Sequence, residues 1–69
     1  MPLIEIRLNG DPYQVDAEAT VADLVRKLDL PADRVAVELD RWIVPRADWS
    51  GRSLAAGAAV EIVQLVGGG

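Results

Sequence analysis

The amino-acid sequence predicts a small α+β domain in which one helix packs against a mixed sheet. Two different periods support this prediction. Apolar residues alternate with polar ones in "LIEIRL", "RVAVEL" and "VEIVQLV", as in strands with one buried face, whereas "TVADLVRKL" repeats them at helical spacing. The chain has 69 residues, a length that suits one domain, and its hydrophobic content of 51% is sufficient for a core.

A β-hairpin is predicted at the beginning of the chain. Residues 3–8 form its first strand, with the apolar side chains of the even-numbered positions on one face. Asn9 and Gly10 both tolerate the positive φ angles of a two-residue turn, so the chain should reverse there. Residues 13–17 then return beside the first strand, and Pro12 suits the turn or the start of this second strand.

One amphipathic helix follows the hairpin. Apolar residues recur on one face from Val21 to Leu28. Thr20 is a good N-cap, and Asp23 three residues later completes a capping box and places negative charge near the positive helix N-terminus. Pro31 prevents the helix from continuing, so we expect it to end near Leu28.

Three further strands are predicted after the helix, at residues 34–39, 42–44 and 60–66. Asp40 and Arg41 should form a tight turn between the first two of these strands. The segment before the last strand should consist of turns and at most one helical turn, with Trp49 or Leu54 filling the edge of the core. Trp42, which lies beside a turn, should be exposed.

The element order β-β-α-β-β-β matches the ubiquitin-like β-grasp, in which one helix crosses a mixed sheet. We therefore expect a β-grasp domain over residues 1–66, with its first and last strands paired in parallel, and a flexible glycine tail over residues 67–69. The buried inner face should be formed mostly by Ile4, Ile6, Tyr13, Val15, Val21, Leu24, Val25, Leu28, Val35, Val37, Val60 and Ile62.

The composition excludes several classes of chemistry. The sequence contains no cysteine and no histidine, which removes disulfides, thiol nucleophiles, thiolate and imidazole metal sites and the usual general base. Its net charge of −4 argues against binding to nucleic acid phosphates. The scattered carboxylates show no metal-ligand pattern, and no phosphate-binding loop is present, so no bound cofactor is predicted. The charged N-terminus is unlike a signal peptide, and we expect a cytoplasmic protein.

The glycines Gly67, Gly68 and Gly69 follow directly on the last predicted strand. Three extended residues carry a terminal carboxylate up to roughly 10 Å from the strand. Because they have no Cβ, they fit a channel that is too narrow for other residues. A carboxylate is inert as an acyl donor until it is activated, and adenylation by ATP would activate it. The alternative is that the glycines are only a loose chain end.

Val63 and Leu65 are candidate partner-binding residues beside the tail. They share one strand face with Glu61, opposite the residues that face the core. They should therefore point away from the helix, and an exposed apolar pair beside a reactive terminus suits docking of a partner. Val66 extends in the direction of the tail and belongs to the same candidate surface. The alternative is that a nearby loop covers these side chains.

The stretch "VAVELDRWIVPRADW", together with "LAAGAAVEIVQLVGGG" at the end of the sequence, resembles the sulfur-carrier proteins of thiamin biosynthesis, the ThiS family. The similar features are an "AVE" strand, "IVPR" followed shortly by Trp, and a "VEIV" strand that closes in Val-Gly-Gly-Gly. They span roughly the C-terminal half, and the N-terminal half is similar in element order and length. Two turns differ: Asp40-Arg41 stands where the family often has Asn-Gly, and residues 56–58 replace a common Asp-Gly-Asp.

The resemblance implies a sulfur carrier, which is a protein co-substrate and not an enzyme. In such a cycle an E1-like adenylyltransferase (ThiF-like) uses ATP to adenylate the carboxylate of the terminal glycine, here Gly69. Sulfur supplied through a cysteine desulfurase then displaces AMP and leaves a thiocarboxylate. Thiazole synthase (ThiG-like) takes this sulfur for the thiazole ring. On this interpretation ATP binds to the activating enzyme and not to this chain.

Other functions remain open on the sequence. The small subunit of molybdopterin synthase is similar in fold and in its terminal Gly-Gly, although it is usually longer and commonly reaches the glycines through a Pro-containing segment. A ubiquitin-like protein modifier would form an isopeptide bond with lysine instead of transferring sulfur. A sulfur carrier for another pathway, and a binding module with an incidental tail, also fit the residues.

Overall fold

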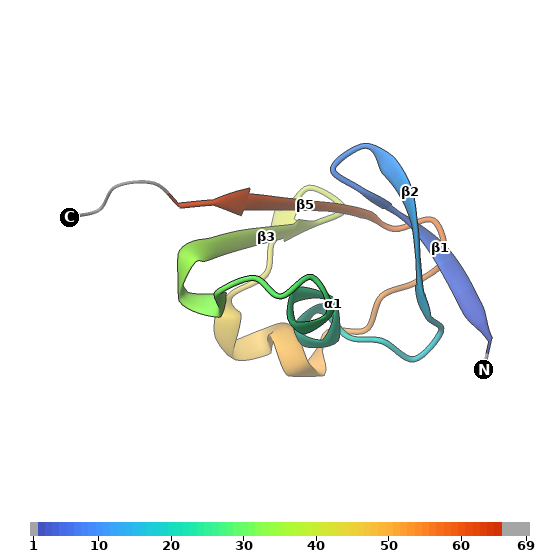
Figure 1. The fold of residues 1–69 in the computed structure, drawn as a ribbon, viewed down its shortest axis with the longest axis horizontal. Coiled ribbons are helices and arrows are strands. Elements are labelled where there is room, and N and C mark those ends of the chain that lie inside the picture. Colours follow the sequence, from blue (N-terminus) through green and yellow to red (C-terminus); the bar gives the residue numbers. More distant parts are fainter. Residues whose placement is uncertain (1, 66–69) are drawn as a thin grey trace.

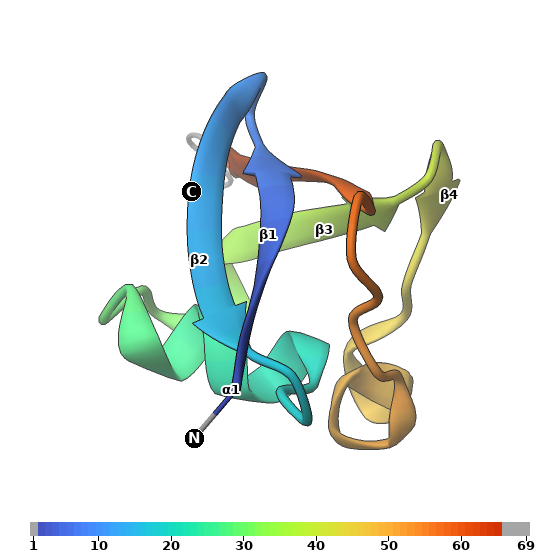
Figure 2. The ribbon, with the colours of Figure 1, turned by 90° about the vertical axis from the view of Figure 1, so that its right-hand side faces the viewer.

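The computed structural model of the protein describes residues 2–65, which form a five-stranded sheet, one α-helix and two 3₁₀ helices. In chain order the elements are β1 (Leu3–Leu8), β2 (Asp11–Asp16), α1 (Val21–Lys27), η1 (Ala32–Arg34), β3 (Val35–Leu39), β4 (Trp42–Ile43), η2 (Arg46–Gly51) and β5 (Ala59–Gln64). The strand order is β2-β1-β5-β3-β4, with β1 and β5 parallel and the other neighbours antiparallel. Helices α1 and η2 lie on the same side of the sheet (Figures 1 and 2). The α+β class, the β-grasp arrangement and the parallel pairing of the first and last strands are confirmed.

Both predicted two-residue turns are present. Asn9 and Gly10 have φ angles of 51° and 88°, and Asp40 and Arg41 have φ angles of 51° and 76°. Positive φ at both central residues gives a turn the twist that matches two paired strands. Arg41 is an uncommon residue in this conformation. Asp40 supports the turn because its carboxylate accepts a hydrogen bond of 2.9 Å from the N–H of Ala59.

Helix α1 begins and ends where the sequence predicts. Thr20 is the N-cap, and its hydroxyl oxygen accepts a hydrogen bond of 3.2 Å from the N–H of Asp23. In return, the Asp23 carboxylate accepts a hydrogen bond of 2.9 Å from the N–H of Thr20. Leu28 is the C-cap. The capping box therefore satisfies two N–H groups at the start of the helix that have no partner within it.

The capping box makes stability depend on pH in the acidic range. Hydrogen bonds from the Thr20 backbone and side chain, with the nearby charge of Arg26, hold the pKa of Asp23 below its ordinary value of 3.8. A carboxylate whose pKa is lowered on folding stabilises the protein above its unfolded pKa, and this contribution is lost as the pH falls through the folded pKa. We therefore expect Asp23→Asn to lower Tm by a constant amount above about pH 5, and by less and less as the pH falls below 3.8.

Thermal melts of both proteins between neutral and strongly acidic pH measure this difference. The control is Asp11→Asn, which removes an exposed carboxylate on β2 that lies outside the helix cap. If the Tm difference for Asp23→Asn stays the same throughout the acidic range, the capping role of the charged carboxylate is wrong.

The core lies between the sheet and the two helices α1 and η2. Most of the predicted inner-face residues are buried, whereas Ile4, Tyr13, Leu28 and Ile62 are half-buried at its edges. Further buried side chains complete the core: Ala19, Leu39, Val44, Trp49, Leu54 and Ala58. Trp49 and Leu54 therefore both fill the edge of the core, as predicted for that segment.

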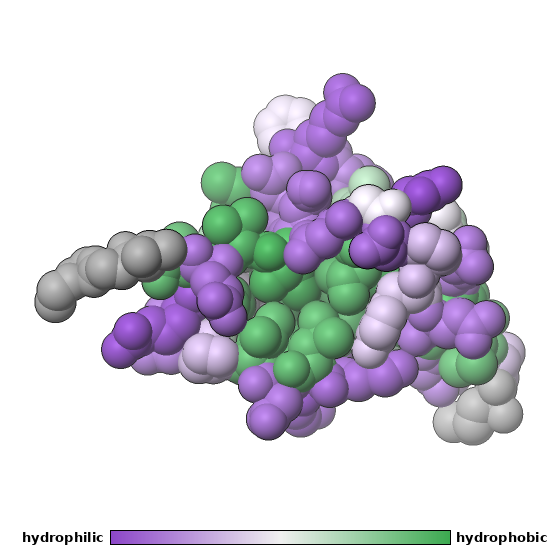
Figure 3. Space-filling model, turned by 45° about the horizontal axis from the view of Figure 1, so that its top comes forward, coloured by the Kyte–Doolittle hydropathy of each residue, from purple (hydrophilic) through white to green (hydrophobic). Residues whose placement is uncertain are grey.

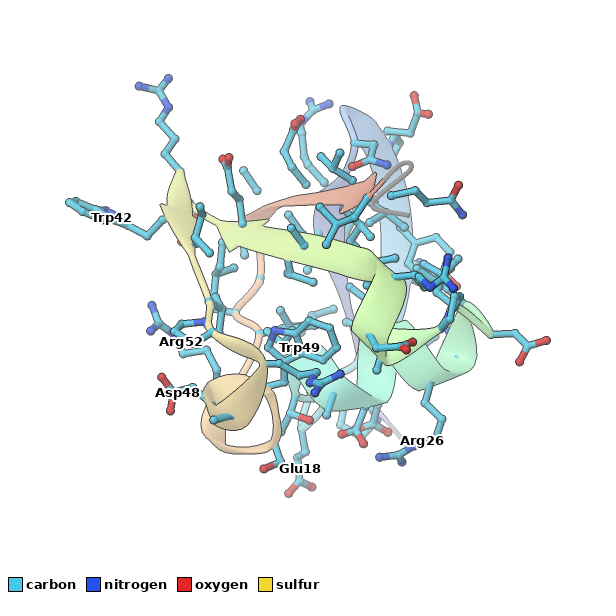
Figure 4. All side chains as sticks on the ribbon, turned by 90° about the vertical axis from the view of Figure 1, so that its left-hand side faces the viewer. Glu18, Arg26, Trp42, Asp48, Trp49 and Arg52 are labelled. Carbon is cyan, nitrogen blue, oxygen red and sulfur yellow. The ribbon has the colours of Figure 1, made fainter. Side chains whose placement is uncertain are left out.

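Two tryptophans lie in opposite environments. Trp49 points from η2 toward the core, and its indole N–H donates a hydrogen bond of 2.9 Å to the C=O of Val44 (Figure 4). Trp42 projects outward from β4 and is 76% exposed (Figure 4). Both positions agree with the sequence analysis. The indole hydrogen bond matters because a buried N–H without a partner would destabilise the fold.

Several element boundaries differ from the prediction. β2 begins at Asp11 and includes Pro12, which an edge strand tolerates because its missing N–H would have faced solvent. Arg34 was predicted as the start of the third strand. It ends η1 instead, because its N–H donates to the C=O of Pro31 at 3.0 Å. Ala17, Val44 and Leu65 lie just outside β2, β4 and β5, and β5 begins at Ala59, one residue before its predicted start. The 3₁₀ helix η2, with six residues, is longer than the one helical turn predicted for that segment.

Candidate functional site

The predicted tail begins at the end of a central strand. β5 lies between β1 and β3 and runs toward Leu65 at one end of the molecule (Figure 1). The N–H of Leu65 donates a hydrogen bond of 2.7 Å to the C=O of Arg34, which fixes the chain just after the strand ends. The predicted site residues Val66, Gly67, Gly68 and Gly69 lie outside the described residues. The structure therefore shows where this segment begins, directly after Leu65.

Asn9 joins the first hairpin turn to β5. Its side-chain carbonyl accepts a hydrogen bond of 2.8 Å from the N–H of Ile62, and its side-chain amide donates one of 3.3 Å to the C=O of Ile62. Its backbone N–H donates to the C=O of Val60 at 2.8 Å. The side-chain amide of Asn9 therefore pairs with the backbone of β5 in the way that the backbone of one more β1 residue would. The sequence indicates only a turn at Asn9, and this contact was not predicted.

The apolar pair beside the tail is exposed. Val63 and Leu65 are 55% and 56% exposed, so the alternative that a loop covers them is wrong. Figure 3 shows hydrophobic side chains gathered in the middle of one face of the molecule and bordered by hydrophilic ones. Docking of a partner on Val63, Leu65 and Val66 stays a prediction.

The strand register adds two residues to this surface. On the outer face of the sheet, Val63 lies opposite Ala36, and Ile43 lies opposite Glu38. Ile43 is 69% exposed. We call Ala36, Ile43, Val63 and Leu65 the outer-face patch. Ala36 and Ile43 were not predicted as part of this surface, because the alternation within a strand does not reveal which residues of neighbouring strands lie opposite each other.

Two carboxylates interrupt the outer-face patch. Glu38 and Glu61 lie directly opposite each other on β3 and β5. Like charges in this arrangement repel each other. They line a shallow hollow of about 350 Å³ together with Arg7 and Arg41. The two arginines place positive charge in the same hollow as the two carboxylates.

The described side chains offer little chemistry of their own. Among residues 2–65, no three acidic side chains come together as a metal site. Within the same range, no helix is long and apolar enough to cross a membrane. Cysteine and histidine are absent from the whole sequence.

Comparison with known proteins identifies relatives over almost the whole chain. A sequence model of the ThiS family matches residues 6–69. A thiazole synthase of Magnetococcus marinus is 32% identical over 66 residues, which cover 96% of this chain and 20% of the synthase. The ycf40 protein of Pyropia yezoensis is also 32% identical, with 96% of this chain and 93% of that protein covered.

A solved structure agrees with these relatives. The crystal structure of the thiamine biosynthesis protein ThiS from Geobacter metallireducens has a TM-score of 0.83 and 30% identity, with 96% of this chain and 100% of that chain covered. The chain spans only 20% of the length of the thiazole synthases of M. marinus and Paramagnetospirillum magneticum. The family match extends from β1 through the three glycines. The chain belongs to the ThiS family.

Proposed function

We propose that this protein is a sulfur carrier for thiazole formation in thiamin biosynthesis and that the carboxylate of Gly69 carries the sulfur. The observation that supports this most directly is the ThiS family match, which runs through the three glycines to residue 69. The crystal structure of a ThiS protein, which covers 96% of this chain, supports the same role. Because the reacting group belongs to the main chain, the protein acts as a co-substrate and needs no catalytic side chain.

The proposed chemistry has three steps. A carboxylate oxygen of Gly69 attacks the α-phosphorus of ATP, which releases pyrophosphate and forms an acyl adenylate. The terminal sulfur of a persulfide then attacks the carbonyl carbon and AMP leaves, which gives an acyl disulfide. A thiol reductant cleaves its S–S bond, so that the thiocarboxylate is released and the thiol is oxidised to a disulfide. Since the chain has no cysteine, the sulfur must come from another protein, for which a cysteine desulfurase is the proposed source. ATP binds to the activating enzyme, and we place these steps in the cytoplasm.

Thiazole synthase is the proposed acceptor of the sulfur. In M. marinus and P. magneticum, a protein named thiazole synthase contains a region that is 32% identical to this chain within a much longer polypeptide. Two proteins that react with each other meet more often when they are joined in one polypeptide, because the effective concentration of each partner is then high. This combination in the relatives supports thiazole synthase as a partner of this chain, next to an E1-like activating enzyme (ThiF-like).

The loading assay tests the proposal directly. The purified protein is incubated with ATP, a cysteine desulfurase, cysteine, a thiol reductant and the E1-like enzyme of the same genome, and its intact mass is measured. We expect the mass change that corresponds to replacement of one carboxylate oxygen by sulfur, followed by loss of this sulfur when thiazole synthase and its substrates are added. Transfer only to a molybdopterin synthase, or an isopeptide bond to lysine, would replace this proposal by one of the other functions.

Val63 on the outer-face patch should contribute to docking on the activating enzyme. Replacing Val63 by aspartate places a charge on an exposed apolar contact, so we expect KM for this protein to rise roughly tenfold in an ATP–pyrophosphate exchange assay. The fold should stay intact because the side chain is 55% exposed.

Leu3→Asp is the matched control for this variant. Leu3 is 57% exposed, but it lies at the start of β1, whereas β1 contacts β5 only near Arg7 and Leu8. The control should therefore keep KM close to that of the wild type. An equal rise in KM for both variants would contradict a specific role of the outer-face patch.

A further inference from the structure

The end of β5 has an open backbone edge on the side away from β3. The hydrogen bond from the N–H of Leu65 to the C=O of Arg34 shows that the odd-numbered residues of this strand direct their backbone groups toward β3. The even-numbered residues face the other way, where Ile62 meets the side chain of Asn9. Gln64 comes next on this side, and no residue of the described chain pairs with its N–H or C=O. Asn9 therefore closes the edge up to Ile62 and leaves it open at Gln64.

A hollow with an apolar lining lies directly beside this edge. It has a volume of about 360 Å³, and its lining residues are Leu8, Asn9, Leu28, Leu30, Ile62 and Gln64. The apolar ones among them are only half-buried. An unpaired strand edge next to an apolar hollow is the arrangement used for strand addition, in which main-chain hydrogen bonds provide affinity and alternate side chains enter a pocket. The hollow thus accepts one apolar side chain of an added strand.

The reach of the tail limits which protein occupies this edge. Four residues follow Leu65 in the sequence, and an extended chain of that length spans at most roughly 14 Å. An enzyme that holds the carboxylate of Gly69 in its active site must therefore place its surface within that distance of Leu65. The open edge at Gln64 is adjacent to Leu65, so it lies within reach of the same enzyme surface.

We infer that the open edge at Gln64 pairs with an extended segment of the activating enzyme, which inserts one apolar side chain into the hollow lined by Leu28 and Leu30. This inference rests on the proposed function, because the activating enzyme is the partner that must hold the tail. The pairing continues the sheet of this protein into the enzyme. It holds the start of the tail in an extended conformation directed toward the enzyme's active site.

The first test separates the backbone of Gln64 from its side chain. Gln64→Pro removes the N–H that would pair with the enzyme, but it removes no hydrogen bond to β3, since this N–H faces away from β3. Gln64→Ala keeps the N–H and is the matched control. We expect Gln64→Pro to raise KM for this protein about threefold to tenfold, the effect of one lost hydrogen bond, with little change in kcat. Gln64→Ala should behave like the wild type, and melts verify that both fold.

The second test does not depend on a proline variant. The chain has no cysteine, so Leu30→Cys introduces a single thiol at the hollow, and Glu18→Cys introduces one at an exposed position on the loop before α1. Each protein is alkylated with iodoacetamide, with and without the activating enzyme that loads the wild type, and ATP is withheld. Intact mass of the small chain gives the alkylation rate. We expect the enzyme to slow alkylation at position 30 by about tenfold or more and to leave position 18 unchanged.

The outcomes distinguish this inference from the proposed function. If no activating enzyme loads the wild type, the proposed function fails and the inference falls with it. If the wild type is loaded but both thiols react equally with the enzyme present, or Gln64→Pro and Gln64→Ala have equal KM values, the inference alone is overturned. Protection at position 30 that rises with the concentration of this chain alone would assign the edge to a second copy. Protection in the free chain that disappears on deletion of residues 67–69 would assign it to the chain's own tail.

Discussion

Replacing Leu24 by alanine should lower the free energy of unfolding by about 2–5 kcal/mol. Leu24 is 1% exposed and lies on the helix face that packs against the sheet, so its truncation removes buried methyl groups and leaves a cavity. A domain of 69 residues buries a limited apolar area, and natural domains are stable by only about 5–15 kcal/mol. The loss is therefore a large part of the total. Urea denaturation followed by tryptophan fluorescence measures it, because Trp49 reports on the core.

Gln14→Ala is the control for this substitution. Gln14 is exposed on the edge strand β2, and its truncation should change the free energy of unfolding by less than about 0.5 kcal/mol. A loss below about 1 kcal/mol for Leu24→Ala would show that the α1 face is not the central support of the core.

The local elements could be predicted because their signals lie within a few residues of one another. Asn9-Gly10 specifies a turn by its tolerance of positive φ, and the observed angles of 51° and 88° agree. Thr20 and Asp23 form the predicted capping box through contacts three residues apart. These signals act on the backbone directly, so they are independent of how the strands later pair.

The relative placement of distant strands could be predicted only by analogy with the β-grasp. Nothing in the alternation of β3 and β5 specifies that Val63 lies opposite Ala36, or that Glu38 and Glu61 face each other. Such a register depends on packing against α1 and on the connecting loops. The hydrogen bond from the Trp49 indole to the C=O of Val44 is local in sequence, but it forms only when η2 directs Trp49 into the core, which the sequence does not specify.

The candidate site likewise has features that the sequence predicts and features that it does not. The exposure of Val63 and Leu65 could be predicted, because it follows from the period of one strand. The contact between Asn9 and Ile62 joins residues 53 positions apart and uses a side-chain amide that the turn itself does not need. Any residue that tolerates positive φ would satisfy the turn, so the sequence carries no separate signal for this contact. Only the structure reveals this contact, which determines where along β5 the backbone edge becomes accessible.

Shortening or branching the tail should abolish function while the fold is kept. Deletion of Gly69 draws the reacting carboxylate back by one residue, about 3.3–3.6 Å. Gly68→Val keeps the length but adds a β-branched side chain that restricts the backbone and widens the chain. A misplacement of about 1 Å in a reacting group is enough to reduce a rate on the order of 100-fold, so we expect at least that loss of thiocarboxylate formation in both variants.

The melting temperature of both variants should equal that of the wild type, because every side chain of the described core stays unchanged. Gly51→Val is the matched control: the same substitution is made in η2, where an added Cβ would have no neighbour within 4 Å and φ is not positive. It should leave both the melt and the loading rate unchanged. A Gly68→Val protein that melts normally and gains sulfur at the wild-type rate would refute threading of the tail into a narrow channel. A collapse of the melt in the tail variants would instead assign the glycines a structural role. The combination of a normal melt with lost loading is expected only if the glycines serve the partner's active site, since no other property of the described domain changes.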